Sequence, residues 1–519
     1  MNDKIRGTIP YLNSSERWRF WQEQERNLML ISRYSWKNPS NGTNSEAYNS
    51  LLLTKGFMMM TEVGLKEYIL NQNNDSLLVL YNELMAQKNE LTQYKNSPNI
   101  EANKIQTLER NLHSKELSFM KDPRIQGYSD GLFSDWRDIQ SSMDEKDAAI
   151  EFIEREFYDD KQTILAFVIR KNYDAPHVVE LNGFIDYYNS VCEQYRDNPN
   201  ITDLIYTNDS LYSKIWGALE LELRDVENIY FSPDGLLNTL AIENLFYNGI
   251  GLTATKRLYR VASTRELLNN NNTKIDKALL YGGLNYELKH DKKGGCDNTT
   301  KVKKNNDRGA IIDEGEFLVD LEGTKIEVKS IHSILERNGV SSTVLMENEG
   351  TEMSFNLLSG KDVSILHIAT HGTYNENGNS TIDNIEQEDK SMSHSCLYLT
   401  DAKNAILQND AFSQNKANGV LTAKEIALLD LKNVDLVTLS ACETGLGVVN
   451  SEGVFGLQRG FKKARANSIL MSLWKVDDEA TCKLMTEFYS NWISKKMTKH
   501  DALEAAKKTA RETKGWEDP

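Results

Sequence analysis

The chain has 519 residues, and its 60 Lys and Arg side chains against 76 Asp and Glu side chains give a formal net charge of −16. Its length predicts about three or four domains, and a hydrophobic fraction of 39% excludes a wholly disordered chain. No apolar run approaches the roughly 20 residues that a membrane helix needs, and the first residues lack the apolar stretch of a secretory signal. The acidic balance disfavours a nucleic-acid platform, because phosphate binding favours a basic face.

The five cysteines are scattered along the chain, and no two are spaced as C-x-x-C. This arrangement disfavours both a disulfide framework and a zinc site, and we expect neither a metal nor another cofactor. It fits a reduced, cytoplasmic chain in which one thiol is available as a nucleophile. Four of the cysteines lie in settings that predict packing or an exposed thiol without a role: Cys192, Cys296, Cys396 and Cys482.

Residues 1–140 are predicted to be helical, because apolar residues such as Leu65, Tyr68 and Ile69 recur at intervals of three and four. A polar stretch at 87–116 predicts a solvated helical hairpin whose turn lies at 96–99. No clean repeat of about 34 residues is visible in this region. The pattern therefore leaves room only for degenerate helical-repeat hairpins.

A second pattern begins near Asp147, where runs of β-branched and aromatic residues predict strands. Helical periodicity follows them, and a Ser-Pro-Asp-Gly turn ends the last strand of the group. We therefore expect a small α/β domain over 147–270. The predicted strands cover 148–153, 162–169, 177–181 and 226–231, and the predicted helices cover 183–195 and 210–223.

The segment 276–519 alternates strands with helices, which predicts a mostly parallel sheet with helices on both faces. Two polar stretches, 289–308 and 373–393, are predicted to be surface loops, either switches or inert insertions. The predicted strands cover 278–283, 342–346, 363–369, 396–399, 436–440 and 468–473. The predicted helices cover 324–338, 351–358, 422–428, 453–463 and 478–492.

Two of these strands end close to a reactive side chain. His371 and Gly372 follow the strand 363–369, and Cys442 follows the strand 436–440. Active groups of parallel sheets lie at the carboxyl ends of the strands, so neighbouring strands would bring the two side chains to one edge. An imidazole there can take the proton of a thiol. The backbone N–H groups of Gly372 and Cys442 could then hold a developing oxyanion.

The same spacing has a plainer interpretation. A buried cysteine is most often an inert small hydrophobic residue, and spacing alone leaves this open for Cys442. His367 points into the strand interior and is predicted to be structural. The remaining histidines have no comparable setting.

Several motifs around these residues resemble one known family. The candidate His and Cys lie in LHIATHG (366–372) and VTLSACETGLG (437–447), followed by SEGVFGLQRGFKKARANSILMSLWKVDDEAT (451–481). The upstream segments AAIEFIERE (148–156), FSPDGLLNTLAIENL (231–245) and RVASTRELL (260–268) fit the same pattern. Together they resemble the CHAT family of caspase-like cysteine peptidases, which are related to separase and often fused to tetratricopeptide repeats.

The resemblance implies an endopeptidase that uses a Cys–His dyad and no metal. His371 would be the general base and then the acid for the leaving amine, and Cys442 would form the thioester. Gly372 and Cys442 would supply the oxyanion N–H groups. The fold implied is a caspase-like, mostly parallel sheet flanked by helices over 276–519. A proteolytically silent caspase-like companion domain over 147–270 and an N-terminal α-helical region would precede it.

The resemblance also suggests a substrate pocket. In separase-like relatives an acid of a Trp-x-Val-x-Asp stretch lies in the pocket, and Asp478 falls on that position here. A buried carboxylate would favour Arg or Lys before the scissile bond. Glu443 and Asp477 are further candidate acids. The alternative is that Asp477 and Asp478 cap the next helix, where Asp is favoured.

Two departures from the family pattern concern the ends of the chain. Family members usually continue into a short aromatic strand, whereas this chain stops at Pro519 and resembles a shortened version. The helical N-terminal region is also short for a repeat array. Both differences suggest altered regulation.

The implied partners are a protein substrate, for example a gasdermin-like effector, and a regulatory protein or complex that binds the helical region. The implied setting is a bacterial immune or cell-death pathway in the cytoplasm, without direct contact to nucleic acid or membrane. Two alternatives stay open. The chain could be a catalytically latent interaction scaffold, or a Cys hydrolase or acyltransferase that cleaves no peptide bond.

Overall fold

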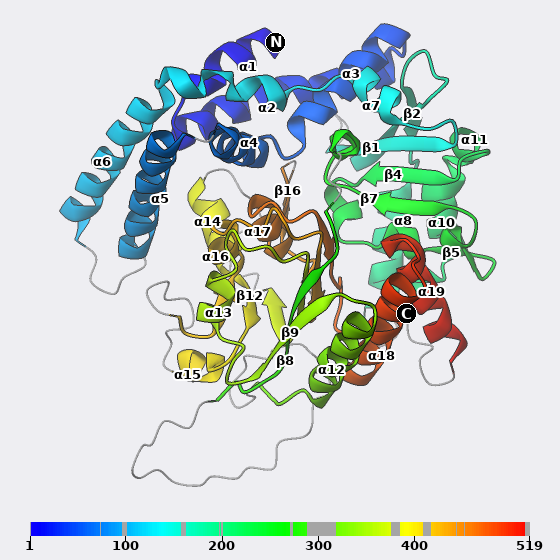
Figure 1. Ribbon diagram of the computed structural model, residues 1–519. Coiled ribbons are helices and arrows are strands. Elements are labelled where there is room, and N and C mark those ends of the chain that lie inside the picture. The colour runs from blue at the N-terminus through cyan, green and yellow to red at the C-terminus, as the bar shows by residue number, and fades with distance from the viewer. Residues whose placement is uncertain are drawn as a thin grey trace.

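The computed structural model shows helices at the N-terminus, followed by two separate five-stranded sheets (Figure 1). The helices arch over both sheets, and the C-terminal helix lies between the sheets. The domain boundaries inferred from the sequence stay predictions. The structure describes residues 2–72, 74–95, 101–156, 162–196, 198, 201–269, 273–287, 318–374, 385–407, 417–442, 444–450 and 452–513.

The N-terminal part is helical as predicted, and side-chain caps fix where its long helices begin. Asn13 and Glu16 form a reciprocal capping box at the start of α2, and Ser40 and Thr43 form another at α3. The predicted hairpin is the pair α5 and α6, and its turn lies outside the described residues. The helices are α1 (Asn2–Thr8), α2 (Ser14–Lys37), α3 (Asn41–Thr54), α4 (Phe57–Asn71), α5 (Asp75–Lys95), α6 (Ala102–Met120) and α7 (Trp136–Ser142).

The companion sheet has the strand order β3-β2-β1-β4-β7 and is mixed. Strand β1 pairs antiparallel with β2 and parallel with β4. The strands are β1 (Asp147–Glu156), β2 (Gln162–Arg170), β3 (His177–Glu180), β4 (Asn228–Ser232) and β7 (Arg257–Arg260). The connecting segments hold α8 (Phe184–Gln194), α9 (Ile201–Tyr206), α10 (Asp209–Tyr212), α11 (Glu220–Leu223) and the hairpin β5 (Phe246–Tyr247) and β6 (Ile250–Gly251).

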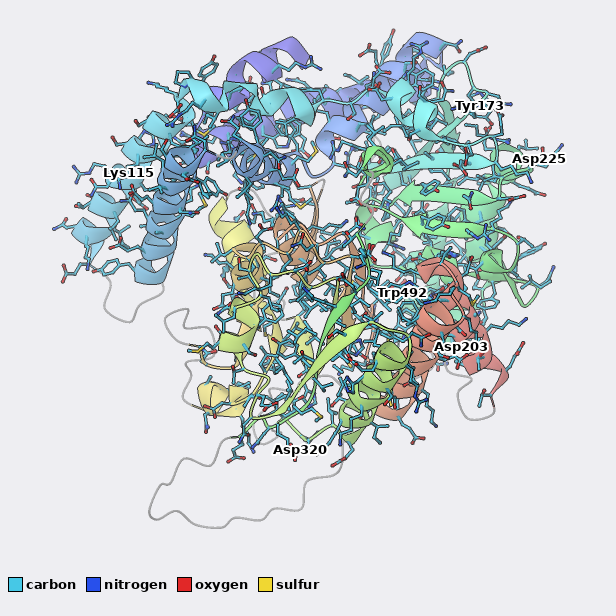
Figure 2. All side chains as sticks on the ribbon, in the orientation of Figure 1. Lys115, Tyr173, Asp203, Asp225, Asp320 and Trp492 are labelled. Carbon is cyan, nitrogen blue, oxygen red and sulfur yellow. The ribbon has the colours of Figure 1, made fainter. Side chains whose placement is uncertain are left out.

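Both faces of the companion sheet are covered because β1 alternates its apolar side chains. Ile150 and Phe152 join the core formed with the helices of the companion domain. Ile153, on the other face, packs with Leu51 of α3 and Trp136 of α7. The helical region thus forms one layer of the companion domain. Figure 2 shows Lys115 of α6 at the opposite side of the molecule from Tyr173 and Asp225 of the companion domain.

The main sheet has the order β17-β14-β10-β8-β9, and all its neighbouring strands are parallel. This confirms the predicted mostly parallel sheet. The strands are β8 (Lys277–Leu284), β9 (Ser341–Glu347), β10 (Ile365–Ala369), β14 (Leu436–Ser440) and β17 (Ser468–Leu470). A side sheet holds β11 (Gly372–Tyr374), β12 (Ser395–Tyr398) and β13 (Val420–Thr422).

Helices cover both faces of the main sheet. Ile365 of β10 faces a core shared with α12 (Glu322–Arg337), α18 (Asp478–Tyr489) and α19 (Lys499–Glu512). Leu366, on the opposite face, packs in a core with α13, α16 and α17. The elements on that side are α13 (Glu352–Asn356), α14 (Ile385–Ser393), α15 (Ala402–Leu407), α16 (Ala423–Ala427) and α17 (Leu457–Lys463).

The structure corrects three of the predicted elements. The polar stretch 373–393 is not one loop, since it contains β11 and the helix α14. The predicted helix 453–463 begins as a hairpin of β15 (Val448–Asn450) and β16 (Gly453–Phe455), and becomes helical only at Leu457. The predicted strand 396–399 is β12, which belongs to the side sheet rather than to the main sheet.

Two further points concern α19 and the segment 289–308. The helix α19 was not predicted, and the loop 289–308 lies outside the described residues. Within the described ranges, no helix has both the length and the apolar composition needed to cross a membrane.

Candidate active site

His371 and Cys442 follow two neighbouring strands of the main sheet. Strands β10 and β14 are parallel, and Ala369 pairs with Ser440 in their register. Each reactive residue lies two positions beyond this pair, so both leave the sheet at the same carboxyl edge. A Cβ atom added to Gly372 would lie 3.1 Å from the carbonyl oxygen of Cys442, which shows how closely the two segments approach.

A backbone oxygen orients the imidazole of His371. Its Nε2 lies 2.8 Å from the carbonyl oxygen of Val319, in the segment that leads into α12. A carbonyl can only accept a hydrogen bond, so Nε2 carries the proton. In the neutral ring Nδ1 is then the basic nitrogen. The ring centroid of Tyr286 lies 5.1 Å from that of the imidazole.

The thiol of Cys442 is enclosed by the backbone of one residue. Its Sγ accepts a hydrogen bond from the N–H of Val476 at 3.1 Å and donates to the carbonyl oxygen of Val476 at 3.7 Å. The side chain of Cys442 is fully buried. A sulfur without exposed surface cannot contact a substrate carbonyl, so the structure holds this site closed.

The structure describes two of the three candidate pocket acids, and these two make different hydrogen bonds. Asp478 accepts a hydrogen bond from the N–H of Gly323, in the first turn of α12, at 2.7 Å. Asp477 is the N-cap of α18 and accepts from the N–H of Ala480 at 2.8 Å, as the capping alternative expected. Glu443 lies outside the described residues. The pocket role of these acids stays a prediction.

His367 lies in a buried polar network beneath the site. Its Nε2 lies 2.8 Å from the carboxylate of Glu327 on α12, and its Nδ1 lies 3.3 Å from the hydroxyl of Tyr489 on α18. The side chains of His367 and Glu327 are both fully buried. This position agrees with the structural role predicted for His367.

Sequence reasoning missed the groups that hold the pair in place. Val319 and Val476 act through backbone atoms, which leave no residue-type signal in a sequence. The role of Gly323 is a close approach, because a Cβ atom there would lie 2.5 Å from the carboxylate of Asp478. This role is visible only in the structure, where the glycine lies opposite an acidic side chain that is far away in the sequence.

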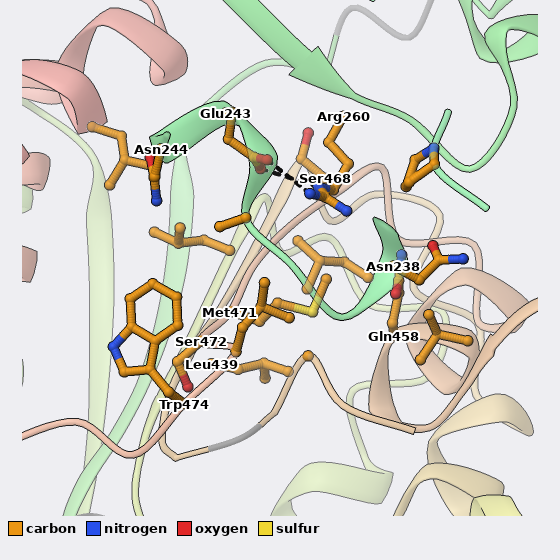
Figure 3. A pocket seen from close by; sticks show the side chains of 18 of the residues that line it. Asn238, Glu243, Asn244, Arg260, Leu439, Gln458, Ser468, Met471, Ser472 and Trp474 are labelled. Atoms are coloured by element: carbon orange, nitrogen blue, oxygen red, sulfur yellow. Dashed lines mark hydrogen bonds and ion pairs between the residues drawn. The ribbon is translucent and has the colours of Figure 1, made fainter. Parts of the chain in front are cut away.

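A cavity of about 950 Å³ lies beside the site, between the two large sheets. Both β7 and β17, which end the strand orders of their sheets, contribute to its wall. Figure 3 shows the ion pair of Glu243 and Arg260 on one side and Leu439, Met471 and Trp474 on the other. The residues 471–477 line this cavity, so it reaches the segment that encloses Cys442.

Metal ligands were also sought in the structure. Among the residues that it describes, no group of three or more His, Cys, Asp or Glu side chains is arranged to hold a metal ion.

Fold and site together define a class of protein, a caspase-like α/β protein with a His and a Cys at the ends of adjacent parallel strands. The family model of the CHAT domain matches residues 207–519, which is more than half of the chain. The chain therefore belongs to the CHAT domain family. This confirms the family predicted from the motifs, and with it the class of caspase-like cysteine peptidases.

Two solved structures align with the chain at low similarity. The Arg-specific cysteine proteinase gingipain R (RgpB) aligns at 11% identity over 60% of this chain and 65% of its own, with a TM-score of 0.36. A complex of Porphyromonas gingivalis RgpB pro- and mature domains aligns at 11% identity over 64% and 73%, with a TM-score of 0.34. The alignment thus spans less than two thirds of the first of these chains. No curated protein matches the sequence.

Proposed function

We propose that this chain is an endopeptidase in which Cys442 and His371 act as a catalytic dyad. One observation carries the proposal: the register of β10 and β14 brings both residues to one carboxyl edge of a parallel sheet. The hydrogen bond from His371 to the Val319 carbonyl adds support, because it leaves the other ring nitrogen basic. A base of that kind is what a cysteine nucleophile needs.

The reaction follows from these groups. His371 Nδ1 removes the proton of the Cys442 thiol, and the sulfur attacks the carbonyl carbon of the scissile peptide bond. The N–H groups of Gly372 and Cys442 stabilise the oxyanion of the tetrahedral intermediate. The intermediate collapses to a thioester, and the departing amine takes its proton from the imidazolium. Water, deprotonated by the same imidazole, then hydrolyses the thioester and restores the thiol.

The proposed specificity is for Arg or Lys before the scissile bond, with Asp478 as the acid that receives the cation. Glu443 and Asp477 are alternative acids for this pocket. A charge-assisted contact between a carboxylate and a guanidinium discriminates strongly against neutral side chains. In the closed site the Oδ2 atom of Asp478 accepts a hydrogen bond from the Gly323 N–H.

The proposed substrate is a protein, for example a gasdermin-like effector, in a bacterial immune or cell-death pathway of the cytoplasm. A regulatory protein or complex would bind the helical region and switch the peptidase on. The burial of Cys442 supports such control, because an enclosed thiol needs a signal before it can react. The same observation supports a second candidate function, a permanently closed interaction scaffold.

An active-site probe separates the two functions. The purified chain is incubated with an acyloxymethyl ketone that ends in Arg, and the labelled residue is located by mass spectrometry. For a peptidase we expect labelling at Cys442, slowed by about 100-fold or more in His371→Ala, the size of a lost general base. Equal labelling of Cys442 in both proteins would contradict the dyad. Absence of label in the wild-type chain would mean either a peptidase that awaits its activating signal or the scaffold.

A further inference from the structure

The segment 474–478, called the cover segment from here on, lies over the thiol of Cys442. Val476, at its middle, contacts the sulfur with both its N–H and its carbonyl oxygen. Both groups belong to the backbone, so the contact depends on where the segment lies and not on the side chain of Val476. Moving the segment away from Cys442 would therefore break both of these contacts with the sulfur.

The first end of the cover segment is held by the companion domain. The ring of Trp474 lies 5.4 Å from the ring of Tyr206, in α9. Leu473 and Trp474 also pack against the buried core of the companion domain. This end of the segment therefore touches the companion domain, while Ser472, just before it, is hydrogen-bonded to the carbonyl oxygen of Ala441 beside Cys442.

The second end is held by α12. The carboxylate of Asp478 accepts a hydrogen bond from the backbone N–H of Gly323 at 2.7 Å. A Cβ atom at position 323 would lie 2.5 to 2.6 Å from three atoms of that carboxylate. Heavy atoms do not approach so closely, so the contact needs glycine at this position.

Space for movement lies behind the cover segment. Its residues 474–477 line the cavity of about 950 Å³, and Val476 among them also contacts the thiol of Cys442. Densely packed interiors resist displacement, whereas a segment beside an open cavity can shift without repacking a core. The geometry thus allows the segment to withdraw from the sulfur.

We infer that the cover segment is a closing device held at two ends, by Tyr206 of the companion domain and by Gly323 of α12. Its withdrawal exposes Cys442 and at the same time releases the Asp478 carboxylate from Gly323. The same segment carries the Val476 backbone, which covers the thiol, and the Asp478 carboxylate. One movement therefore opens access to the thiol and also completes a pocket for a basic side chain. This coupling deepens the proposed peptidase function and rests on it.

The contact with Gly323 offers a precise test. Gly323→Ala adds one methyl group, which displaces the Asp478 carboxylate and loosens one end of the cover segment. The matched control is Gly42→Ala, because Gly42 is also the second residue of a helix and has nothing within 4 Å of an added Cβ atom. Alanine favours a helix over glycine in both places, so helix propensity cannot explain a difference between the two variants.

The measurement is the rate at which iodoacetamide alkylates Cys442 in the full chain, followed by mass spectrometry. Iodoacetamide reports exposure of the thiol without needing a substrate pocket. We expect Gly323→Ala to raise the rate about tenfold or more, the size of losing one hydrogen bond to a charged group. Gly42→Ala should react at the wild-type rate. A wild-type rate in Gly323→Ala would overturn the inference.

Cys396 serves as an internal standard, because it is fully buried in β12 and lies outside the cover segment. If Gly323→Ala exposes Cys396 as well as Cys442, the variant has unfolded, and Asp478→Ala decides by removing the same contact from its other side. The inference requires Asp478→Ala to raise alkylation of Cys442 alone. Exposure of Cys396 in both variants, or of Cys442 in neither, would contradict it.

The Arg-ended ketone distinguishes failure of this inference from failure of the proposed function. Gly323→Ala should react faster with both reagents, whereas Asp478→Ala should gain reactivity only toward iodoacetamide. Suppose that the double variant Gly323→Ala/His371→Ala keeps both the fast alkylation and the fast ketone reaction. The inference about the cover segment is then supported, and the proposed dyad is contradicted. If the wild-type ketone reaction depends on His371 but Gly323→Ala changes nothing, the dyad stands and the cover segment fails.

Discussion

The imidazole of His371 is oriented by the carbonyl oxygen of Val319, which belongs to the backbone. A backbone acceptor cannot be removed by replacing the side chain at 319. A scan of side-chain substitutions would therefore not reveal this contact. The position of that carbonyl depends on α12, which begins shortly after it. The helix, rather than a residue type, therefore determines the orientation of the His371 imidazole.

Gly372→Ala tests the close approach of the two strand ends. The added Cβ atom would lie 3.1 Å from the carbonyl oxygen of Cys442 and from Cγ2 of Thr444. Neighbours must shift by a few tenths of an ångström, which moves His371 relative to the thiol. We expect the rate of ketone labelling at Cys442 to fall about tenfold, since small misplacements of reacting groups are costly.

Gly7→Ala is the control for that experiment, because an added Cβ atom at Gly7 has open space around it. It should label like the wild-type chain. If Gly372→Ala also labels at the wild-type rate, the tight spacing between the strand ends is irrelevant to reactivity.

At the level of elements, α12 links the parts of the site. Val319 precedes it, Gly323 opens it, and Glu327, one turn further on, pairs with His367 of β10. The hydroxyl of Tyr489 on α18 lies near His367 and also 3.0 Å from the hydroxyl of Thr438 on β14. A buried polar network thus fastens two helices to the two strands that carry the proposed dyad.

His367→Ala is expected to destabilise the fold by about 3 kcal/mol, because it removes the imidazole that hydrogen-bonds the fully buried carboxyl group of Glu327. The thermal melting temperature of the full chain measures the loss. The control is His332→Ala. His332 lies on α12, as Glu327 does, but is only partly buried, so its loss should change the melting temperature much less. Equal effects of the two substitutions would mean that the buried pair contributes nothing special.

The sequence predicted the strands β10 and β14 well, because both are continuous apolar runs that are buried on both faces. The helix α14 escaped prediction, since its burial depends on the pairing of Glu388 with Arg459. From the sequence alone, the side chains of Glu388 and Arg459 are expected to be charged and solvated rather than buried. The hairpin of β15 and β16 escaped for another reason: Gly453 has a φ of 102°, which breaks the helical pattern assumed there.

At the level of the site, residue types identified His371 and Cys442 but not their closed arrangement. The enclosure of the thiol by Val476 arises from backbone atoms of a segment that follows β17. Such contacts depend on the position of the chain in space, and no residue pattern records them. The capping role of Asp477 was among the stated alternatives because Asp is a frequent N-cap.

On the scale of the whole molecule, buried polar contacts tie the helical region to the companion sheet and to the hairpin of β15 and β16. Lys55 lies 2.9 Å from Glu151 of the companion sheet, and both side chains are nearly or fully buried. On the other side, the N–H of Met58 in α4 donates to the carboxylate of Glu452, between β15 and β16. A partner that displaces α4 would therefore disturb the hairpin that follows the Cys442 segment.

Lys55→Ala should loosen the helical region from the companion sheet. The substitution leaves Glu151 buried without its cation, at a cost of about 3 to 5 kcal/mol. Limited proteolysis of the full chain should then cut within the helical region faster than in the wild-type chain. The control is Lys37→Ala, at the exposed end of α2. Unchanged proteolysis of Lys55→Ala would show that apolar packing alone holds the region.

Glu452 makes the stability depend on pH. Burial raises the pKa of Glu452 to about 8, with Glu25 and Glu388 acting in the same direction and Arg459 and the Met58 N–H opposing. The folded chain therefore keeps a proton that the unfolded chain releases above its ordinary pKa of 4.5. By linkage, this group lowers stability as the pH rises from about 4.5 to about 8.

Glu452→Gln removes that dependence, because glutamine stays neutral. The melting temperature of the variant minus that of the wild-type chain should increase between about pH 5 and pH 8. Glu349→Gln, at an exposed position, should show no such trend. A constant difference across this range would mean that Glu452 does not hold its proton in the folded chain.

The contact of Phe455 with the helical region has a consequence for how the protein is made. Phe455 completes an apolar cluster with Trp18, Trp21 and Phe57, which leave the ribosome first. About 400 residues separate Phe57 from Phe455, and synthesis at about 5 to 20 residues per second needs roughly 20 to 80 seconds for them. During that time the cluster lacks its last member, so a nascent chain cannot assemble this junction before Phe455 has been translated.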